Sequence, residues 1–192
     1  MKAVLISIQP KWCELIANGK KTVEVRKTKP KIETPFKVYI YCTFGGDWLT
    51  SVDGVVQKPG TCTIPLKTAK TVCELNGRVI GEFVCDEIIV AECGSYCKIH
   101  SQDSQLDVFD LMEYADEKTV FGWHISNLII YDEPKELSEF FAYCDRCDKR
   151  PIACKFAYEE SNENGYYSEC MCDFKRPIER PPQSWCYVEE MR

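Results

Sequence analysis

Charged side chains at short intervals stand out in the stretch GKKTVEVRK, residues 19–27. Lys21 offers a mobile positive charge, and Arg26 offers a planar set of donors that fits a phosphate or a base edge. Glu24 between them can accept a hydrogen bond from a base amino group or pair with both cations. The pattern indicates either a charged ligand site or a solvated strand face with ordinary salt bridges, each worth about 0–1 kcal/mol.

An alternating strand must carry this charged set. In KTVEVRK, Val23 and Val25 share one face of the expected strand, and Thr22, Glu24 and Arg26 share the other. The valine face is the one suited to a core. The polar face is therefore free to line a surface or a cleft.

A short helix must deliver the chain to this strand. The segment KWCELIANG predicts a helix that begins at Pro10 and ends at Gly19. Lys21 then lies at the junction between this helix and the strand. Trp12 lies at the start of that helix. An aromatic ring there is a candidate platform for a base, because base–aromatic stacking contributes about 1–3 kcal/mol.

Many short strands and few helices are expected along the rest of the chain. Helices are expected over 104–115, with Ser104 as its cap, and briefly after Pro134. Residues 45–76 have weak periodicity and predict a long loop or hairpin insertion. Strands are expected over 3–8, 36–44, 77–93 with a bulge at Gly81, 119–132 as a pair or one kinked strand, and 184–188. Many strands with few helices favour a small mixed barrel over a doubly wound sheet.

The order of these elements, with G-x-K-x-x-E-x-R at Gly19, Lys21, Glu24 and Arg26, resembles the ASCH domain of the PUA-like superfamily. The segments GEFVCDEI and FGWHISNLIIYDEP resemble later strands of that family. The resemblance covers about residues 1–140. It implies an α+β fold: a small mixed β-barrel with short helices at its openings and a cleft beside the first helix. The family is expected to bind RNA or nucleotide-like ligands in that cleft.

Two regions follow from this resemblance. Residues 1–140 are expected to form the ASCH-like barrel domain, and residues 141–192 a cysteine-rich extension. The last segment, about 181–190, is expected to pack back on the barrel, because SWCYV resumes an alternating strand after two prolines.

The expected ligand-binding residues combine the motif with nearby aromatic and polar groups. Trp123 and His124 belong to the set because they lie in the candidate partner strand, although tryptophan is most often a core anchor and histidine is often simply hydrogen-bonded. The full set is Trp12, Lys21, Thr22, Glu24, Arg26, Trp123 and His124.

Binding of RNA or a nucleotide-like small molecule is the function that this resemblance favours. The alternative is a small amidohydrolase acting on an acetylated nucleoside, or a ribonuclease, with Lys21 and Glu24 as the catalytic residues. One bacterial branch that resembles this domain hydrolyses acetylated cytidine with a lysine at the position of Lys21, but it has a threonine where this chain has Glu24. A protein-interaction module that uses the tail is a third option, and the sequence does not decide whether the chain is an enzyme.

Thirteen cysteines are many for a chain of 192 residues. Those in the first hundred residues are expected to pack as small hydrophobic groups. Near the C-terminus, Cys144-x2-Cys147 and Cys170-x-Cys172 present paired thiolates that suit a structural zinc ion, with Cys154 or Cys186 as substitutes. The alternative is a set of free thiols, so no cofactor beyond this candidate zinc is expected.

Global composition limits the partners. A net charge of −6 and a pI near 5.1 argue against a broad basic surface for long duplex nucleic acid, but leave room for a local basic cleft. No apolar run approaches the ~20 residues of a membrane span, and the N-terminus has too short an apolar stretch for a signal peptide. We therefore expect a cytoplasmic protein with no membrane partner.

Overall fold

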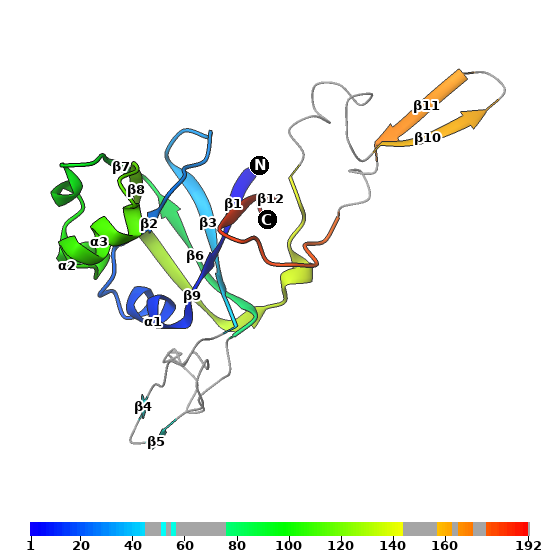
Figure 1. The fold of residues 1–192 in the computed structure, drawn as a ribbon. Helices are drawn as coiled ribbons and strands as arrows, with labels where there is room; N and C mark the ends of the chain where they lie inside the picture. The colour runs from blue at the N-terminus through cyan, green and yellow to red at the C-terminus, as the bar shows by residue number, and fades with distance from the viewer. Residues whose placement is uncertain are drawn as a thin grey trace.

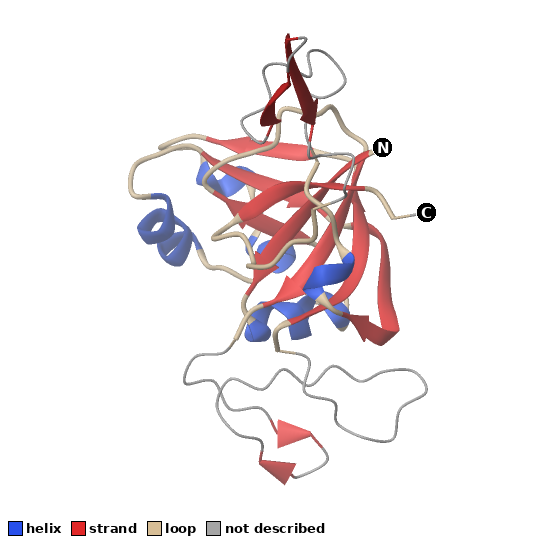
Figure 2. Cartoon of the chain, turned by 90° about the vertical axis from the view of Figure 1, so that its right-hand side faces the viewer, coloured by secondary structure: helices blue, strands red, loops and turns tan. Residues whose placement is uncertain are grey.

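The computed structural model describes residues 1–44, 76–143 and 176–191, and the backbone of four short strands at 51–52, 55–56, 157–162 and 165–170. Strands form most of the fold, and the helices lie at its margins (Figure 2). The α+β class expected from the sequence is confirmed. Within the described residues no helix has the length and apolar character needed to cross a membrane.

A five-stranded sheet forms the larger part of the molecule (Figure 1). Strands β1 and β3 are parallel, and all other neighbours in this sheet are antiparallel. In spatial order the strands are β12 (Trp185–Glu189), β1 (Lys2–Ile8), β3 (Phe36–Cys42), β6 (Arg78–Cys85) and β9 (Ser126–Lys135). Six of the seven residues of β1 are buried, as expected for an apolar, β-branched strand inside a sheet.

A second, three-stranded antiparallel sheet carries the charged motif. Its order is β2 (Val23–Arg26), β8 (Val120–His124) and β7 (Ile88–Ala91). The chain passes from one sheet to the other between β6 and β7, and passes back between β8 and β9. The expectation of one long strand over 77–93 is therefore wrong, whereas 119–132, expected as a pair or one kinked strand, forms two consecutive strands that lie in different sheets. The strands in the described ranges belong to separate sheets, so closure into a barrel stays a prediction.

Gly81 lies where β6 is irregular. The register shifts between Val79 and Gly81 against β9, and a Cβ at position 81 would lie 2.4 Å from the carbonyl oxygen of Ile129. Only glycine permits this close approach of two backbones, which agrees with the bulge expected there.

The helices are short. They are α1 (Pro10–Ala17), α2 (Ser101–Ser104) and α3 (Val108–Ala115), with 3₁₀ turns η1 (Tyr96–Lys98) and η2 (Leu137–Glu139). Two predicted boundaries are wrong. Ser104 ends α2, while α3 begins after Asp107, whose carboxylate accepts hydrogen bonds from the N–H groups of Phe109 and Asp110. Pro134 lies inside β9, and only the single turn η2 follows it.

Three apolar clusters hold these elements together. The largest packs α1 against the five-stranded sheet and contains Trp123, whose ring meets that of Phe36 edge-on at 5.8 Å. A second lies between that sheet and η2, around Tyr39 and Phe140. The third packs the valine face of β2 against α3, with Val23 and Val25 both buried. The polar face of β2 consequently points the other way.

The C-terminal strand returns to the sheet, since β12 pairs with β1 along five residues. Most of the expected insertion at 45–76 lies outside the described residues. Its described part is the antiparallel pair β4 (Ser51–Val52) and β5 (Val55–Val56). A further antiparallel pair, β10 (Ala157–Asn162) and β11 (Gly165–Cys170), falls in the predicted extension.

Candidate functional site

The end of α1 places the motif lysine. Gly19 has a φ of +68°, a conformation that glycine adopts without steric cost. The N–H groups of Lys20 and Lys21 both donate to the carbonyl of Leu15, at 2.9 and 3.0 Å. This left-handed stop turns the chain sharply from α1 into β2. Lys21 is thereby brought back against the helix, with its side chain only 2% exposed.

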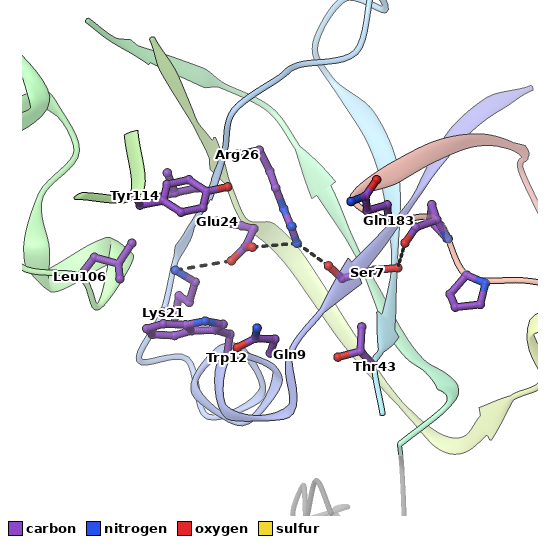
Figure 3. Close-up of a pocket in the computed structure, with 13 residues that line it drawn as sticks. Ser7, Gln9, Trp12, Lys21, Glu24, Arg26, Thr43, Leu106, Tyr114 and Gln183 are labelled. Carbon is purple, nitrogen blue, oxygen red and sulfur yellow. Dashed lines mark hydrogen bonds and ion pairs between the residues drawn. The ribbon is translucent and has the colours of Figure 1, made fainter. Parts of the chain in front are cut away.

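Glu24 holds two cations in a buried ion-pair network. Its carboxylate lies 3.5 Å from the ammonium of Lys21 and 3.0 Å from the guanidinium of Arg26. The three side chains lie in a row in the site (Figure 3). Glu24 and Arg26 are 7% and 13% exposed, so this is not the solvated salt-bridge face that was the alternative. Removing one partner from such a network leaves an uncompensated buried charge.

Arg26 links this network to the first strand. Its Nη2 donates to the backbone carbonyl of Ser7 at 2.6 Å, while its buried Nε has no partner in the described structure. Ser7 in turn donates its hydroxyl to the carbonyl of Pro182 and its N–H to that of Ser184, at 2.6 and 2.9 Å. A continuous chain of polar contacts therefore runs from Lys21 to the C-terminal return segment.

These groups face a cavity of about 500 Å³. Its floor and walls come from β1, α1, β2, the end of β3, the α2–α3 region and the return segment. Its lining residues are Ser7, Gln9, Trp12, Lys21, Glu24, Val25, Arg26, Thr43, Leu106, Tyr114, Pro181, Pro182 and Gln183. The size lies within the range of about 300–1,000 Å³ that is typical of small-molecule sites.

Burial changes the acid–base properties of two side chains in this cavity. Desolvation lowers the pKa of Lys21 below its ordinary value, against the opposing effect of Glu24. Desolvation raises the pKa of Tyr114, which Arg26 partly offsets. Lys21 is thus the group in this cavity whose charge is most open to loss as the pH rises.

Four of the residues predicted from sequence meet in this cavity: Trp12, Lys21, Glu24 and Arg26. The Trp12 ring lies beside the ammonium of Lys21, which is 4.9 Å from the ring centroid.

The other three predicted residues lie elsewhere. Thr22 donates its hydroxyl to Asp103 at 3.3 Å, Trp123 is fully buried in the core, and His124 contacts the carboxylate of Asp86 at 2.6 Å. None of them lines the cavity. Trp123 and His124 do lie on β8, the partner strand of β2, as expected.

Sequence reasoning missed the neutral polar groups of the cavity. Ser7, Thr43, Tyr114 and Gln183 come from segments far apart in the chain, and nothing in their local patterns marks them. The two prolines at 181 and 182 were a signal of the return segment, but not of its place over the motif.

The predicted zinc ligands cannot be compared with the structure. Cys144, Cys147, Cys154 and Cys172 lie outside the described residues, and only the backbone of Cys170 is described. Cys186 lies in β12, half-buried, and burial raises the pKa of its thiol to about 11. Within the ranges that carry side chains, no group of three or more His, Cys, Asp or Glu residues is arranged to hold a metal ion.

Comparison with known proteins matches this arrangement to a family. The family model of the ASCH domain matches residues 6–135. The chain belongs to the ASCH domain family. No curated protein sequence matches it.

Solved structures of another ASCH protein share the fold. The ASCH protein from Zymomonas mobilis matches at a TM-score of 0.53 and 16% identity, over 98% of this chain and 88% of that chain. Two point variants of that protein match similarly. Their TM-scores are 0.54 and 0.53 at 16% identity, over 99% and 98% of this chain and 92% and 89% of theirs. At this identity the likeness concerns the ASCH fold alone.

Proposed function

We propose that this ASCH domain binds RNA or a nucleotide-like ligand in the cavity lined by Lys21, Glu24 and Arg26. The observation that carries the proposal is the buried Lys21–Glu24–Arg26 network on a cavity of about 500 Å³. ASCH domains are a PUA-like family generally associated with RNA binding, which supports the same class of ligand.

The charges of the network suit an anionic or strongly polar ligand. Two cations share one carboxylate, so one positive charge remains in excess. The buried Nε of Arg26 still has a hydrogen to donate, and an arginine fork is suited to phosphate or to a carbonyl edge. Trp12 beside Lys21 offers a ring to a base. The ligand would thus meet an aromatic face and a cationic centre together.

The size of the cavity limits what can enter. A volume of about 500 Å³ suits one nucleotide or nucleoside, whereas a duplex would have to lie across the surface. An unstacked base from a single strand fits this description, because sequence-specific RNA recognition mostly uses such bases. The acidic net charge of the chain also argues against extended backbone contacts.

A screen of the four nucleosides, their monophosphates and short single-stranded RNAs tests the proposal. We expect at least one to bind the wild type, and we expect Lys21→Ala and Arg26→Ala to weaken that binding by about tenfold or more. Lys20→Ala and Lys118→Ala are matched controls, since both lysines are exposed and lie outside the cavity. Binding that all four variants retain alike would place the ligand elsewhere.

A small hydrolase acting on an acetylated nucleoside is the second candidate. The burial of Lys21, which lowers its pKa, and its contact to Glu24 favour it, because a lysine that gives up its proton more readily is better suited to act as a general base. Incubation of purified protein with N-acetylated cytidine tests this directly. Release of acetate that is lost in Lys21→Gln would support hydrolysis, and binding without turnover would exclude it for this substrate.

A further inference from the structure

The cavity has a second, uncharged wall. Lys21 and Trp12 lie on one side of it, and Ser7, Thr43 and Gln183 lie on the other (Figure 3). Gln183 is exposed to solvent, and no hydrogen bond joins its side-chain amide to another residue in the described part of the chain. This amide is therefore available to a ligand.

We propose that Gln183 is a specificity-determining residue that reads the hydrogen-bonding edge of a nucleobase held in the cavity. The inference rests on the proposed function, because it assigns a role to one wall of the same site. A carboxamide presents one acceptor oxygen and a donor NH₂ group side by side. Nucleobases present complementary pairs of donors and acceptors along their edges, and such paired contacts distinguish one base from another.

The segment that carries Gln183 is held on both sides. The carbonyl of Pro182 accepts from the Ser7 hydroxyl at 2.6 Å, and the carbonyl of Ser184 accepts from the Ser7 N–H at 2.9 Å. Pro181 and Pro182 have fixed φ angles, so this backbone has little freedom. A side chain that discriminates between ligands needs a rigid backbone, because on a mobile backbone its amide could adjust to the edge of any base.

Ser7 also ties this wall to the ionic one. Its backbone carbonyl accepts from Arg26, so one residue sets the separation of the cationic centre from Gln183. The charged network lies on the same side of the cavity as Trp12. A base stacked near Trp12 would therefore turn its polar edge toward the opposite wall, where Gln183 lies. The cationic centre would then meet the phosphate or sugar.

Base preference is the quantity that tests this inference. The affinities of adenosine, cytidine, guanosine and uridine monophosphates are measured for the wild type, Gln183→Ala, Gln183→Glu and the control Gln102→Ala, an exposed amide outside the cavity. We expect Gln183→Ala to reduce the ratio between the best and worst base by about fivefold or more. The carboxylate of Gln183→Glu can only accept hydrogen bonds, and the amino group of cytosine donates one. We therefore expect this variant to favour cytidine over uridine monophosphate more than the wild type does. Gln102→Ala should keep the wild-type ratios.

The outcomes separate this inference from the proposed function. If the wild type binds and Arg26→Ala weakens binding, but both Gln183 variants keep the wild-type base ratios, this inference is wrong and the proposed function stands. If no nucleotide binds the wild type, both are wrong. A uniform loss of affinity in Gln183→Ala with unchanged ratios would mean that Gln183 contributes contact without selecting the base, and would also overturn the inference.

Discussion

The guanidinium of Arg26 donates a hydrogen bond to the backbone carbonyl of Ser7 at 2.6 Å. Ser7 belongs to β1 in the five-stranded sheet, and Arg26 to β2 in the three-stranded sheet. The contact therefore joins the two sheets where the cavity lies. The same nitrogen of Arg26 also contacts Glu24, so one side chain fixes both the strands and the charge network.

Arg26→Lys should keep the positive charge and lose this geometry. A lysine presents a point charge without the planar fork, so it cannot contact Glu24 and Ser7 while leaving a donor for the ligand. We expect ligand affinity to fall by about tenfold, because hydrogen bonds to charged groups contribute about 1.5–3 kcal/mol. Titration calorimetry measures this, with Lys27→Arg as a control for the exchange of one cation for another. Equal affinity in Arg26→Lys and the wild type would show that charge alone matters.

Lys21 predicts a specific dependence of stability on pH. Burial holds its folded-state pKa below the unfolded value, so between these two values the unfolded state binds more protons. The contribution of Lys21 to the free energy of unfolding therefore rises with pH through that window. Lys21→Met removes this titration, and the stability difference between wild type and variant should shift in favour of the wild type as the pH rises toward the ordinary lysine pKa of about 10.4.

Denaturant unfolding of both proteins at several pH values measures this difference. A difference that is constant across the window would mean that the folded state does not depress the pKa of Lys21. The affinity for an anionic ligand should fall as the pH rises, whereas the contribution of Lys21 to stability increases. The affinity falls because the ligand requires the protonated ammonium.

Trp12 should report ligand binding by its fluorescence. Among the described residues it is the tryptophan that lines the cavity, whereas Trp123 is fully buried, and Trp185 packs on Trp123 with ring centroids 6.0 Å apart. We expect Trp12→Ala to cost about 1–3 kcal/mol of binding free energy if a base stacks on the ring. Trp12→Phe should retain most of the affinity while removing the fluorescence change. A change that persists in Trp12→Phe would assign it to another tryptophan.

Local patterns were sufficient to predict much of the motif's surroundings. The alternation of valines with charges in β2 and the glycine after α1 depend on neighbouring residues, and both are reproduced with Val23 buried and Gly19 at positive φ. The motif and the order of elements also indicated the ASCH family, and the match of the ASCH model to residues 6–135 confirms that family.

Long-range pairing explains what could not be predicted. The segment 77–93 has one continuous apolar pattern, yet Asp86 and Glu87 separate two strands that belong to different sheets. Gln183 is some 160 residues from the motif in sequence and reaches the cavity because β12 pairs with β1. Thr22 shares a strand face with Glu24 in the pattern, but it lies before β2 begins and turns toward Asp103.

The paired cysteines in the C-terminal region are candidate zinc ligands, with free thiols as the alternative. If zinc is bound, we expect protein purified without added metal to contain about one zinc ion per chain, held by Cys144, Cys147, Cys170 and Cys172, with Cys154 or Cys186 as substitutes. Folding of such a segment depends on its metal, so a chelator should increase cleavage by protease within 144–172. The cavity residues should be unaffected, which ligand binding in the presence of chelator checks. Zinc far below one per chain, with unchanged cleavage, would mean that these cysteines are free thiols.

Mapping the ligand onto the protein by NMR is the most direct test of whether it binds in the cavity. The nucleotide that binds best is titrated into ¹⁵N-labelled protein, and the signals of the Trp12 indole and the Arg26 guanidinium are followed, with those of the exposed Lys118 region as reference. We predict saturable shifts at Trp12 and Arg26 in the wild type, loss of both shifts in Glu24→Gln, and loss of the Trp12 shift in Arg26→Ala, each in protein that remains folded. Saturable shifts confined to another surface, with Trp12 and Arg26 unchanged, would contradict this prediction.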